Sequence, residues 1–303
     1  MNDPGRPSPA PPGRRAPRRA PLYLGALLVV LVAAVVTVVL VLTGDDDSPV
    51  LPVTTGSSTD TSTTTDNRPW TVVWNEEFNG DAVSSADWNV RHDDYLPYEE
   101  SILTANPQNV KVADGVLTIQ AQRERATVGK TTREFTSGYL DTIGKHSWRY
   151  GRFEMRAKLP LSTGMWPAFW LRGDNGPGEI DILEAVGGMP RFTHQAVHQS
   201  TNGGQGRFQN DFELPSSTVD QWHVYAAEVE PDRITWQIDG TTVFTVPSDQ
   251  APWLRETFDE PLNIRLNLQV GGSFPKYYNH PVTESTEFPA KYTIDWIRVS
   301  QRT

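Results

Sequence analysis

Short segments in which hydrophobic and polar residues alternate fill the chain from Pro69 to its last residue. In residues 117–122 and 152–159, every second side chain is apolar, as in a strand that buries one face and exposes the other. Residues 263–270 follow the same alternation and place Asn, Arg, Asn and Gln on their second face. Each of the three segments is therefore predicted to be a strand. The hydrogen-bonding face of residues 263–270 would suit a sugar.

Turn residues separate these segments. Residues 234–238 and 242–246 flank the dipeptide Asp239-Gly240, which accepts the positive φ angles of a type I′ hairpin turn. There is no internal repeat, and no amphipathic stretch exceeds roughly three helical turns. These features predict an all-β fold in which residues 69–303 form one domain, a sandwich of two antiparallel sheets.

The N-terminal region has a different character. Residues 22–43 are uncharged and rich in Val, Leu and Ala, and as a helix they would cross a bilayer core of about 30 Å. Arginines precede this stretch and aspartates follow it, so residues 1–21 are predicted to be a basic cytoplasmic tail. Residues 44–68 are predicted to be a flexible Ser/Thr/Asp-rich linker. We expect a single-pass plasma-membrane protein with an extracellular domain; the alternative is a cleaved signal peptide and secretion.

Charge and composition exclude several classes of function. The chain has no cysteine, which removes disulfides and thiolate metal sites. Residues 1–21 carry five Arg and one Asp, a net +4, so the remaining 282 residues must carry −14 to reach the overall −10. This balance argues against nucleic acid as a partner. It also disfavours anionic polymers, unless a local basic patch overrides the repulsion.

Three carboxylates, Glu179, Asp181 and Glu184, lie within six residues and alternate with aliphatic side chains. In a regular strand Glu179 and Asp181 share one face, whereas Glu184 would enter the core and Leu183 would join the acids. A β-bulge after Ile182 corrects both problems, because the extra residue returns Leu183 to the apolar side and brings Glu184 beside the other acids. The bulge therefore predicts three acids in one cleft.

Two carboxyl groups about 5 Å apart are what a retaining glycosidase needs, one to attack the anomeric carbon and one to protonate the leaving oxygen. Asp181 between them would hold the nucleophile by a hydrogen bond and help to keep the acid protonated. The alternative is an acidic, solvent-facing strand with Glu184 in the following loop.

Aromatic residues lie just before the acids. Alternation places Trp166 and Trp170 on one strand face and Phe169 on the other, so either Trp could stack on a pyranose ring while Phe169 packs in the core. The alternative is that the whole cluster belongs to the core.

Three polar residues complete the predicted substrate site. His198 follows the acidic strand and would lie beside the acids if the next strand pairs with it, although a lone histidine in a strand is more often structural. Asn267 and Gln269 belong to the polar face of residues 263–270.

The order of motifs resembles glycoside hydrolase family 16, particularly its laminarinase-like branch, whose members are endo-β-1,3-glucanases. The match spans nearly the whole of residues 69–303. Besides the acidic motif and the run Trp-Pro-Ala-Phe-Trp at 166–170, the resemblance rests on residues 73–80, 136–139, 150–154, 266–272 and 294–299.

The resemblance implies a β-jelly-roll of two curved antiparallel sheets with an open substrate cleft. It assigns Glu179 as nucleophile, Asp181 as its helper and Glu184 as acid/base, in a retaining endo-glycoside hydrolase that forms a covalent glycosyl-enzyme intermediate. The bulged motif is similar to that of laminarinases, agarases and carrageenases, which favours β-1,3-glucan over mixed-linkage glucan. Ala185, where laminarinases often have an aromatic residue, leaves the preference among sugars open.

Many relatives bind a structural calcium ion away from the cleft. Glu77 and Asp295 occupy the corresponding positions and are predicted to be its ligands; the alternative is that they are ordinary surface acids. Catalysis is expected to need no cofactor, because the carboxylates supply nucleophile and proton. The expected partners are a neutral β-glucan and, through the N-terminal helix, the membrane. The protein is expected to be a monomer.

Two other functions fit the same residues. One is a transglycosylase that remodels a cell-wall polysaccharide through the same intermediate, with a sugar hydroxyl in place of water. The other is a non-hydrolytic carbohydrate-binding sensor on the same fold, although this chain retains all three acids.

Overall fold

The computed structural model describes residues 66–174, 176–200, 206–219 and 221–303. The predicted basic tail and transmembrane anchor, and residues 44–65 of the predicted linker, lie outside the described residues. Within the described ranges, no helix has the length and apolar character required to span a membrane.

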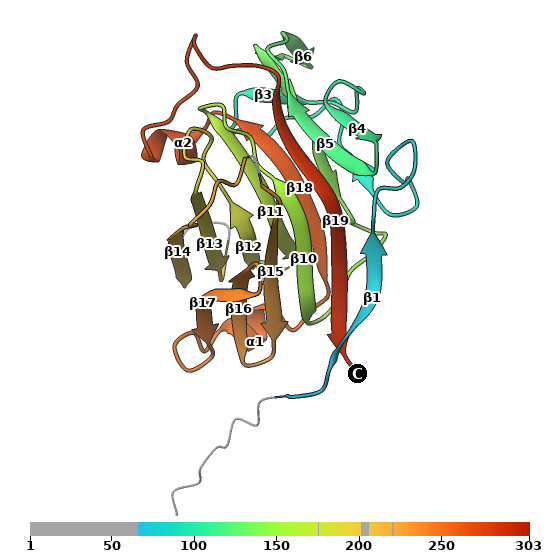
Figure 1. Ribbon diagram of the computed structural model, residues 1–303, viewed down its shortest axis with the longest axis vertical. Coiled ribbons are helices and arrows are strands. Elements are labelled where there is room, and N and C mark those ends of the chain that lie inside the picture. Colours follow the sequence, from blue (N-terminus) through green and yellow to red (C-terminus); the bar gives the residue numbers. More distant parts are fainter. Residues whose placement is uncertain (1–65, 175, 201–205, 220) are drawn as a thin grey trace, which may run out of the picture. The chain divides into compact units, whose positions relative to one another are not determined.

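The fold is built from two large antiparallel sheets, which Figure 1 shows as curved layers. The first sheet has eight strands in the order β17-β16-β15-β10-β19-β5-β4, with β1 also paired to β19. Its strands are β1 (Trp70–Glu76), β4 (Val110–Ala113), β5 (Val116–Ala121), β10 (Gly151–Lys158), β15 (His223–Glu230), β16 (Arg233–Ile238), β17 (Thr241–Pro247) and β19 (Ala290–Arg302).

The second sheet has seven strands in the order β14-β13-β12-β11-β18-β9-β2. Its strands are β2 (Asn89–Val90), β9 (Tyr139–Asp141), β11 (Met165–Gly173), β12 (Glu179–Glu184), β13 (Phe192–His198), β14 (Arg207–Glu213) and β18 (Leu262–Val270). The acidic motif forms β12, and the aromatic motif lies in its neighbour β11.

Smaller elements complete the described part of the chain. Two pairs of short strands lie outside the large sheets, β3 (Ser101–Leu103) with β8 (Phe135–Ser137) and β6 (Ala126–Val128) with β7 (Thr131–Arg133). The helices are α1 (Leu254–Thr257) and α2 (Ser273–Tyr277), one turn each. All pairings are antiparallel except that of β3 with β8.

The core lies between the large sheets and contains the apolar faces of both. Phe153 and Met155 of β10, from the first sheet, are fully buried in the same hydrophobic cluster as Phe169 and Leu171 of β11, from the second. A polar link also joins the layers: the indole Nε1 of Trp236 donates to the backbone carbonyl of Asp181 at 2.9 Å. This hydrogen bond therefore attaches strand β12 to the first sheet.

The structure confirms the all-β prediction and the jelly-roll-like arrangement of two sheets. The strands predicted at 117–122, 152–159 and 263–270 correspond to β5, β10 and β18. Asp239 and Gly240 have φ values of 50° and 76° in the turn between β16 and β17, as a type I′ hairpin requires.

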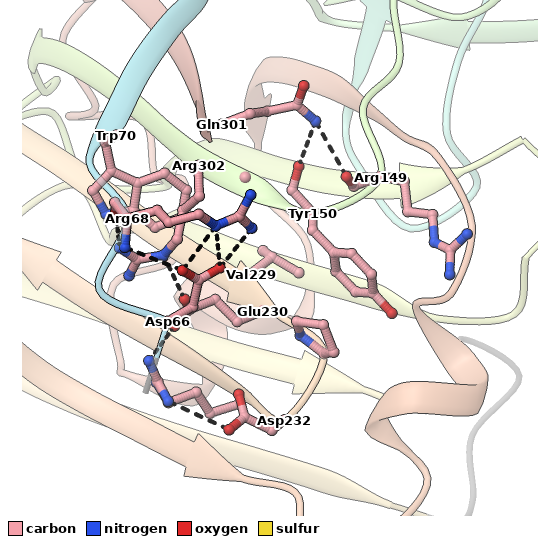
Figure 2. A pocket seen from close by; sticks show the side chains of 13 residues that line it. Asp66, Arg68, Trp70, Arg149, Tyr150, Val229, Glu230, Asp232, Gln301 and Arg302 are labelled. Carbon is pink, nitrogen blue, oxygen red and sulfur yellow. Dashed lines mark hydrogen bonds and ion pairs between the residues drawn. The ribbon is translucent and has the colours of Figure 1, made fainter. Parts of the chain in front are cut away.

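A recess of about 500 Å³ lies where β1, β19 and the turn between β15 and β16 meet. Its arginines all have carboxylate partners. Figure 2 shows Arg68 with Asp66 and Arg302 with Glu230. Arg233 also pairs with Glu230, and Arg149 pairs with Asp259, which lies outside the recess lining.

Candidate active site

A cleft of about 730 Å³ lies on the second sheet, over the strands that carry the predicted site residues. Its lining is formed by Tyr98, Trp166, Ala168, Trp170, Arg172, Glu179, Asp181, Glu184, His198, Ser200, Gly206, Arg207, Gln269 and Ser273. All three predicted catalytic acids are among them. The solvent-facing alternative, with Glu184 in a loop, is wrong, because Glu184 is the last residue of β12 and is buried.

Strand pairing arranges the floor of the cleft in rows. From β13 through β12 to β11, the paired residues are His198–Glu179–Arg172, Ala196–Asp181–Trp170 and His194–Glu184–Ala168. Each acid therefore has a defined neighbour on both sides. The prediction that His198 lies beside the acids is confirmed.

The bulge predicted in β12 is present. Opposite β11, Leu183 pairs with Phe169 and Asp181 with Trp170, so Ile182 has no partner. The register against β13 also shifts between Asp181 and Glu184. Leu183 is consequently buried in the core, while Glu184 turns to the same side as the other two acids.

A glycine allows β12 to begin close to α1. A Cβ atom added to Gly178 would lie 2.4 Å from Thr257 Cγ2 and 2.6 Å from Phe258 Cε1. Only a residue without a side chain fits there, so Glu179 enters the cleft at the first position of the strand.

Glu179 lies among cations. Burial raises the pKa of its carboxyl group, and the charges of His198 and Arg172 act in the opposite direction. Arg172 pairs with Glu179 across the strands, so its guanidinium group favours the ionised form. An ionised carboxylate is what a nucleophile requires.

Asp181 is the more deeply buried neighbour, with 5% of its surface exposed. Burial raises the pKa of Asp181 well above its usual value, and the negative charge of Glu179 raises it further. Its Oδ2 lies 3.1 Å from Nε2 of His198, within hydrogen-bonding distance. Because a charge on Glu179 raises the pKa of Asp181, the pair favours the state with one neutral and one charged carboxyl group.

Glu184 is placed to be a proton donor. Burial raises its pKa well above the usual value, and Asp181 raises it further whenever Asp181 is ionised. The indole Nε1 of Trp166 donates a hydrogen bond of 2.7 Å to Glu184 Oε1, which lowers the pKa but also fixes the carboxyl group. The buried environment thus favours a protonated acid in the cleft at neutral pH.

His198 is half-buried, and burial lowers the pKa of its imidazole. The neutral ring and the two acids Glu179 and Asp181 each offer one ligand atom within 4.8 Å of the others, so these three side chains could hold a divalent cation.

The aromatic motif divides as predicted. Trp166 and Trp170 line the cleft, whereas Phe169 is fully buried in the core. The alternative that the whole cluster belongs to the core is wrong. Trp166 also packs against Phe274 of α2, with ring centroids 4.9 Å apart.

The two polar residues predicted on β18 differ in position. Gln269 lines the cleft, and its buried Oε1 has no hydrogen-bond partner among the described residues. Asn267 is 1% exposed and lies behind the lining, where its Oδ1 accepts a 2.7 Å hydrogen bond from Nε1 of Trp170. Asn267 therefore orients the indole ring of Trp170, which lines the cleft, whereas Gln269 lines the cleft itself.

Sequence reasoning did not identify Tyr98, Arg172, Ser200, Arg207 and Ser273 as residues of the cleft. Arg172 continues the alternation of Trp166 and Trp170, and Ser200 follows His198 at the same two-residue spacing, so that signal could have found both. The other three depend on how distant segments meet, for which the local pattern holds no signal.

Each predicted calcium ligand has an arginine partner. Glu77 accepts hydrogen bonds from Arg298, the shorter being 2.9 Å from Nε to Oε1, and Asp295 pairs with Arg156. The structure therefore shows two salt bridges at these positions, and calcium binding there stays a prediction.

Comparison with known proteins gives a consistent result. Residues 98–298 match the family model described as glycosyl hydrolases family 16. A curated relative, the beta-glucanase of Rhodothermus marinus, is 34% identical over 265 residues, which cover 78% of this chain and 88% of the relative.

Two solved structures are similar over the same extent. The catalytic domain of an endo-1,3-beta-glucanase (laminarinase) from Thermotoga petrophila has a TM-score of 0.72 at 30% identity and covers 78% of this chain and 99% of its own. The endo-beta-1,3-glucanase from Pyrococcus furiosus has a TM-score of 0.72 at 32% identity, with coverages of 78% and 97%.

Proposed function

The chain belongs to glycoside hydrolase family 16, and from this premise we propose that it is a retaining endo-β-1,3-glucanase. The names of its relatives support the substrate class. One observation carries the proposal: the bulge in β12 gathers three carboxyl groups in one cleft, and their surroundings favour different protonation states.

In the first step, a carboxylate oxygen of Glu179 attacks the anomeric carbon of the bound sugar. Glu184 donates its proton to the glycosidic oxygen, and the bond between that oxygen and the anomeric carbon breaks with its electron pair going to the oxygen. The product is an ester between Glu179 and the sugar, with inverted configuration. Protonated Asp181 stabilises the charge on Glu179 before the attack.

In the second step, Glu184 is a carboxylate and removes a proton from water. The water oxygen attacks the anomeric carbon, and the ester bond breaks to restore the Glu179 carboxylate. The second inversion returns the sugar to the β configuration. The groups end in their initial protonation states, so one acid/base residue serves both steps.

Substrate contacts follow from the lining. The rings of Trp166 and Trp170 offer apolar faces for pyranose rings, and the free Oε1 of Gln269 can accept a hydrogen bond from a sugar hydroxyl. The fixed indole of Trp166 links sugar binding to the acid, because its Nε1 holds Glu184.

We also propose, from the sequence pattern, that residues 22–43 anchor the protein in the plasma membrane with the catalytic domain outside the cell. Residues 44–68 would then act as a tether for a monomeric domain.

Product analysis tests the proposed activity. Residues 69–303 are incubated with laminarin, mixed-linkage glucan, agarose and galactan, and released oligosaccharides are separated by size. We expect a series of short oligosaccharides from laminarin, as internal cleavage produces. Binding to laminarin without release of sugar, or release from galactan alone, would contradict the proposal.

A further inference from the structure

Two arginines that line the cleft have side chains without a partner in the described part of the chain. The guanidinium groups of Arg172 of β11 and Arg207 of β14 form neither a hydrogen bond nor an ion pair with any described residue. Arg207 is exposed and Arg172 is partly exposed. The four arginines of the recess, by contrast, are all paired with carboxylates.

The two arginines flank the nucleophile. Arg172 pairs with Glu179 on one side, and on the other Arg207 pairs with His198, which itself pairs with Glu179. The four residues therefore form one row across β11, β12, β13 and β14, which lie side by side in Figure 1. At a strand spacing of about 4.8 Å, the Cα atoms of the two arginines lie roughly 14 Å apart, with Glu179 between them.

The charge of this row is opposite to that of the molecule. Burial raises the pKa of Asp181 and of Glu184 well above their usual values and so favours their neutral forms. With these two acids neutral and Glu179 ionised, the lining has one carboxylate and two guanidinium groups, a local balance of +1 in a chain whose net charge is −10. Unpaired arginines in a cleft raise the local concentration of anions.

We infer that the cleft takes a β-glucan whose sugars carry an anionic substituent beside the linkage that is cut. The inference rests on the proposed function and narrows its substrate. The planar guanidinium group binds a carboxylate or a sulfate through two parallel hydrogen bonds, and a neutral hydroxyl cannot use that geometry. Arg172 and Arg207 form the local basic patch that overrides the repulsion expected from the net charge.

Binding to an inactive variant tests this preference without depending on turnover. Glu184→Gln suits the purpose, because glutamine has the shape and the charge of the protonated acid. Calorimetry compares three laminarin hexasaccharides: unmodified, oxidised to carboxylates at C6, and sulfated at C6. We expect one of the anionic forms to bind at least about tenfold more tightly than the neutral form in low salt, and the advantage to shrink in about 0.5 M salt. The tighter of the two identifies the substituent.

Arginine variants locate the effect. In the Glu184→Gln background, Arg172→Gln and Arg207→Gln should each remove most of the preference, because they lower the affinity for the anionic hexasaccharides far more than the affinity for the neutral one. Arg149→Gln, in the recess, changes the net charge equally and is the matched control; it should leave the preference intact.

Two results would overturn the inference. One is equal or weaker binding of both anionic forms in low salt. The other is a parallel loss of neutral and anionic binding in Arg172→Gln and Arg207→Gln, which would show that the arginines hold sugar hydroxyls. Wild-type turnover of neutral laminarin in the same preparations separates the two proposals. If neutral laminarin is cut, only the inference fails; if no form is cut, the proposed function fails.

Discussion

The cleft and the recess both bury carboxyl groups, but they stabilise them in opposite ways. In the recess, Glu230 lies between Arg233 at 2.5 Å and Arg302 at 2.9 Å, and its side chain is 7% exposed. In the cleft, Asp181 and Glu184 are buried to a similar extent, yet neither has an arginine partner among the described residues. The recess holds a compensated ion, whereas the cleft holds two acids that are most stable when protonated.

The comparison indicates why an acid in the cleft can do chemistry. A carboxylate held between two guanidinium groups is part of a buried ion pair, and its role is structural. A buried carboxyl group without a cation keeps its proton and releases it only when a reacting group accepts it. In this protein, the proposed proton donor Glu184 therefore differs from the structural acid Glu230 in having no cationic partner among the described residues.

The largest effect is expected for the nucleophile. Glu179→Gln should lower kcat by at least about 10⁴-fold on every substrate, because no ester intermediate can form. Hydrolysis of laminarin and of an aryl β-glucoside oligosaccharide, followed in parallel, checks the expectation. Substantial turnover by the folded variant would show that another residue is the nucleophile.

A smaller and substrate-dependent loss is expected for the acid. Glu184→Gln should slow laminarin cleavage by roughly 10²–10⁴-fold, and should slow the first step much less for an aryl glycoside whose leaving group needs no proton. Burst kinetics isolate that first step. Azide should rescue Glu184→Ala and give a β-configured glycosyl azide. Equal losses on both leaving groups would remove Glu184 from the role of acid.

The paired acid of the recess should matter for stability alone. Glu230→Gln leaves Arg233 and Arg302 without their shared anion and should lower the free energy of unfolding by about 3 kcal/mol. Denaturant titration measures this loss. At a temperature where the variant is folded, kcat on laminarin should match that of the wild type; a large fall would show that the two regions are coupled.

Replacement of Glu184, which has no cationic partner among the described residues, should raise the free energy of unfolding, whereas replacement of Glu230 should lower it. The folded-state pKa of Glu184 is raised, so between the unfolded and folded pKa values the folded state binds more protons, and stability falls as pH rises through that window. Glu184→Gln cannot ionise and should therefore be more stable than the wild type at pH 8, by on the order of 1 kcal/mol. The difference should vanish at pH 4. A variant that is less stable at both pH values would contradict a raised pKa for Glu184 in the folded state.

The smallest effect concerns calcium. If a calcium ion replaces Arg298 and Arg156 as the partner of Glu77 and Asp295, it stabilises the folded state by its binding free energy. A chelator removes that stabilisation and should lower the melting temperature by about a few degrees. Initial turnover should stay nearly constant, because these residues lie outside the cleft lining. Identical melting curves with and without chelator would leave the two salt bridges as the whole function of these acids.

Local pattern predicted much of the site. The bulge followed from Leu183 and Glu184 alone, because a regular strand would have exposed one and buried the other. The division of Trp166 and Phe169 between cleft and core followed from alternation, and the turn at Asp239 followed from its tolerance of positive φ.

What the pattern did not predict depends on strand order. Arg207 comes beside His198 only because β14 pairs with β13, and Glu230 meets Arg302 only because distant strands end at one corner. Alternation correctly placed Asn267 on the polar face of its strand. Its hydrogen bond with Trp170 arises because β18 pairs with β11, which alternation does not predict. Charge pairing between distant residues is set by topology, which local sequence does not encode.

The stereochemistry of the first product tests the central claim most directly, since a nucleophilic Glu179 and an acid/base Glu184 on one bulged strand require two inversions. Proton NMR of laminarin hydrolysis, recorded before mutarotation, resolves the anomeric protons of the new reducing ends. We expect the β-anomer to form first and the α-anomer to appear later, as mutarotation proceeds. If the α-anomer forms first, the enzyme is inverting, and both the covalent intermediate and the assigned roles are wrong.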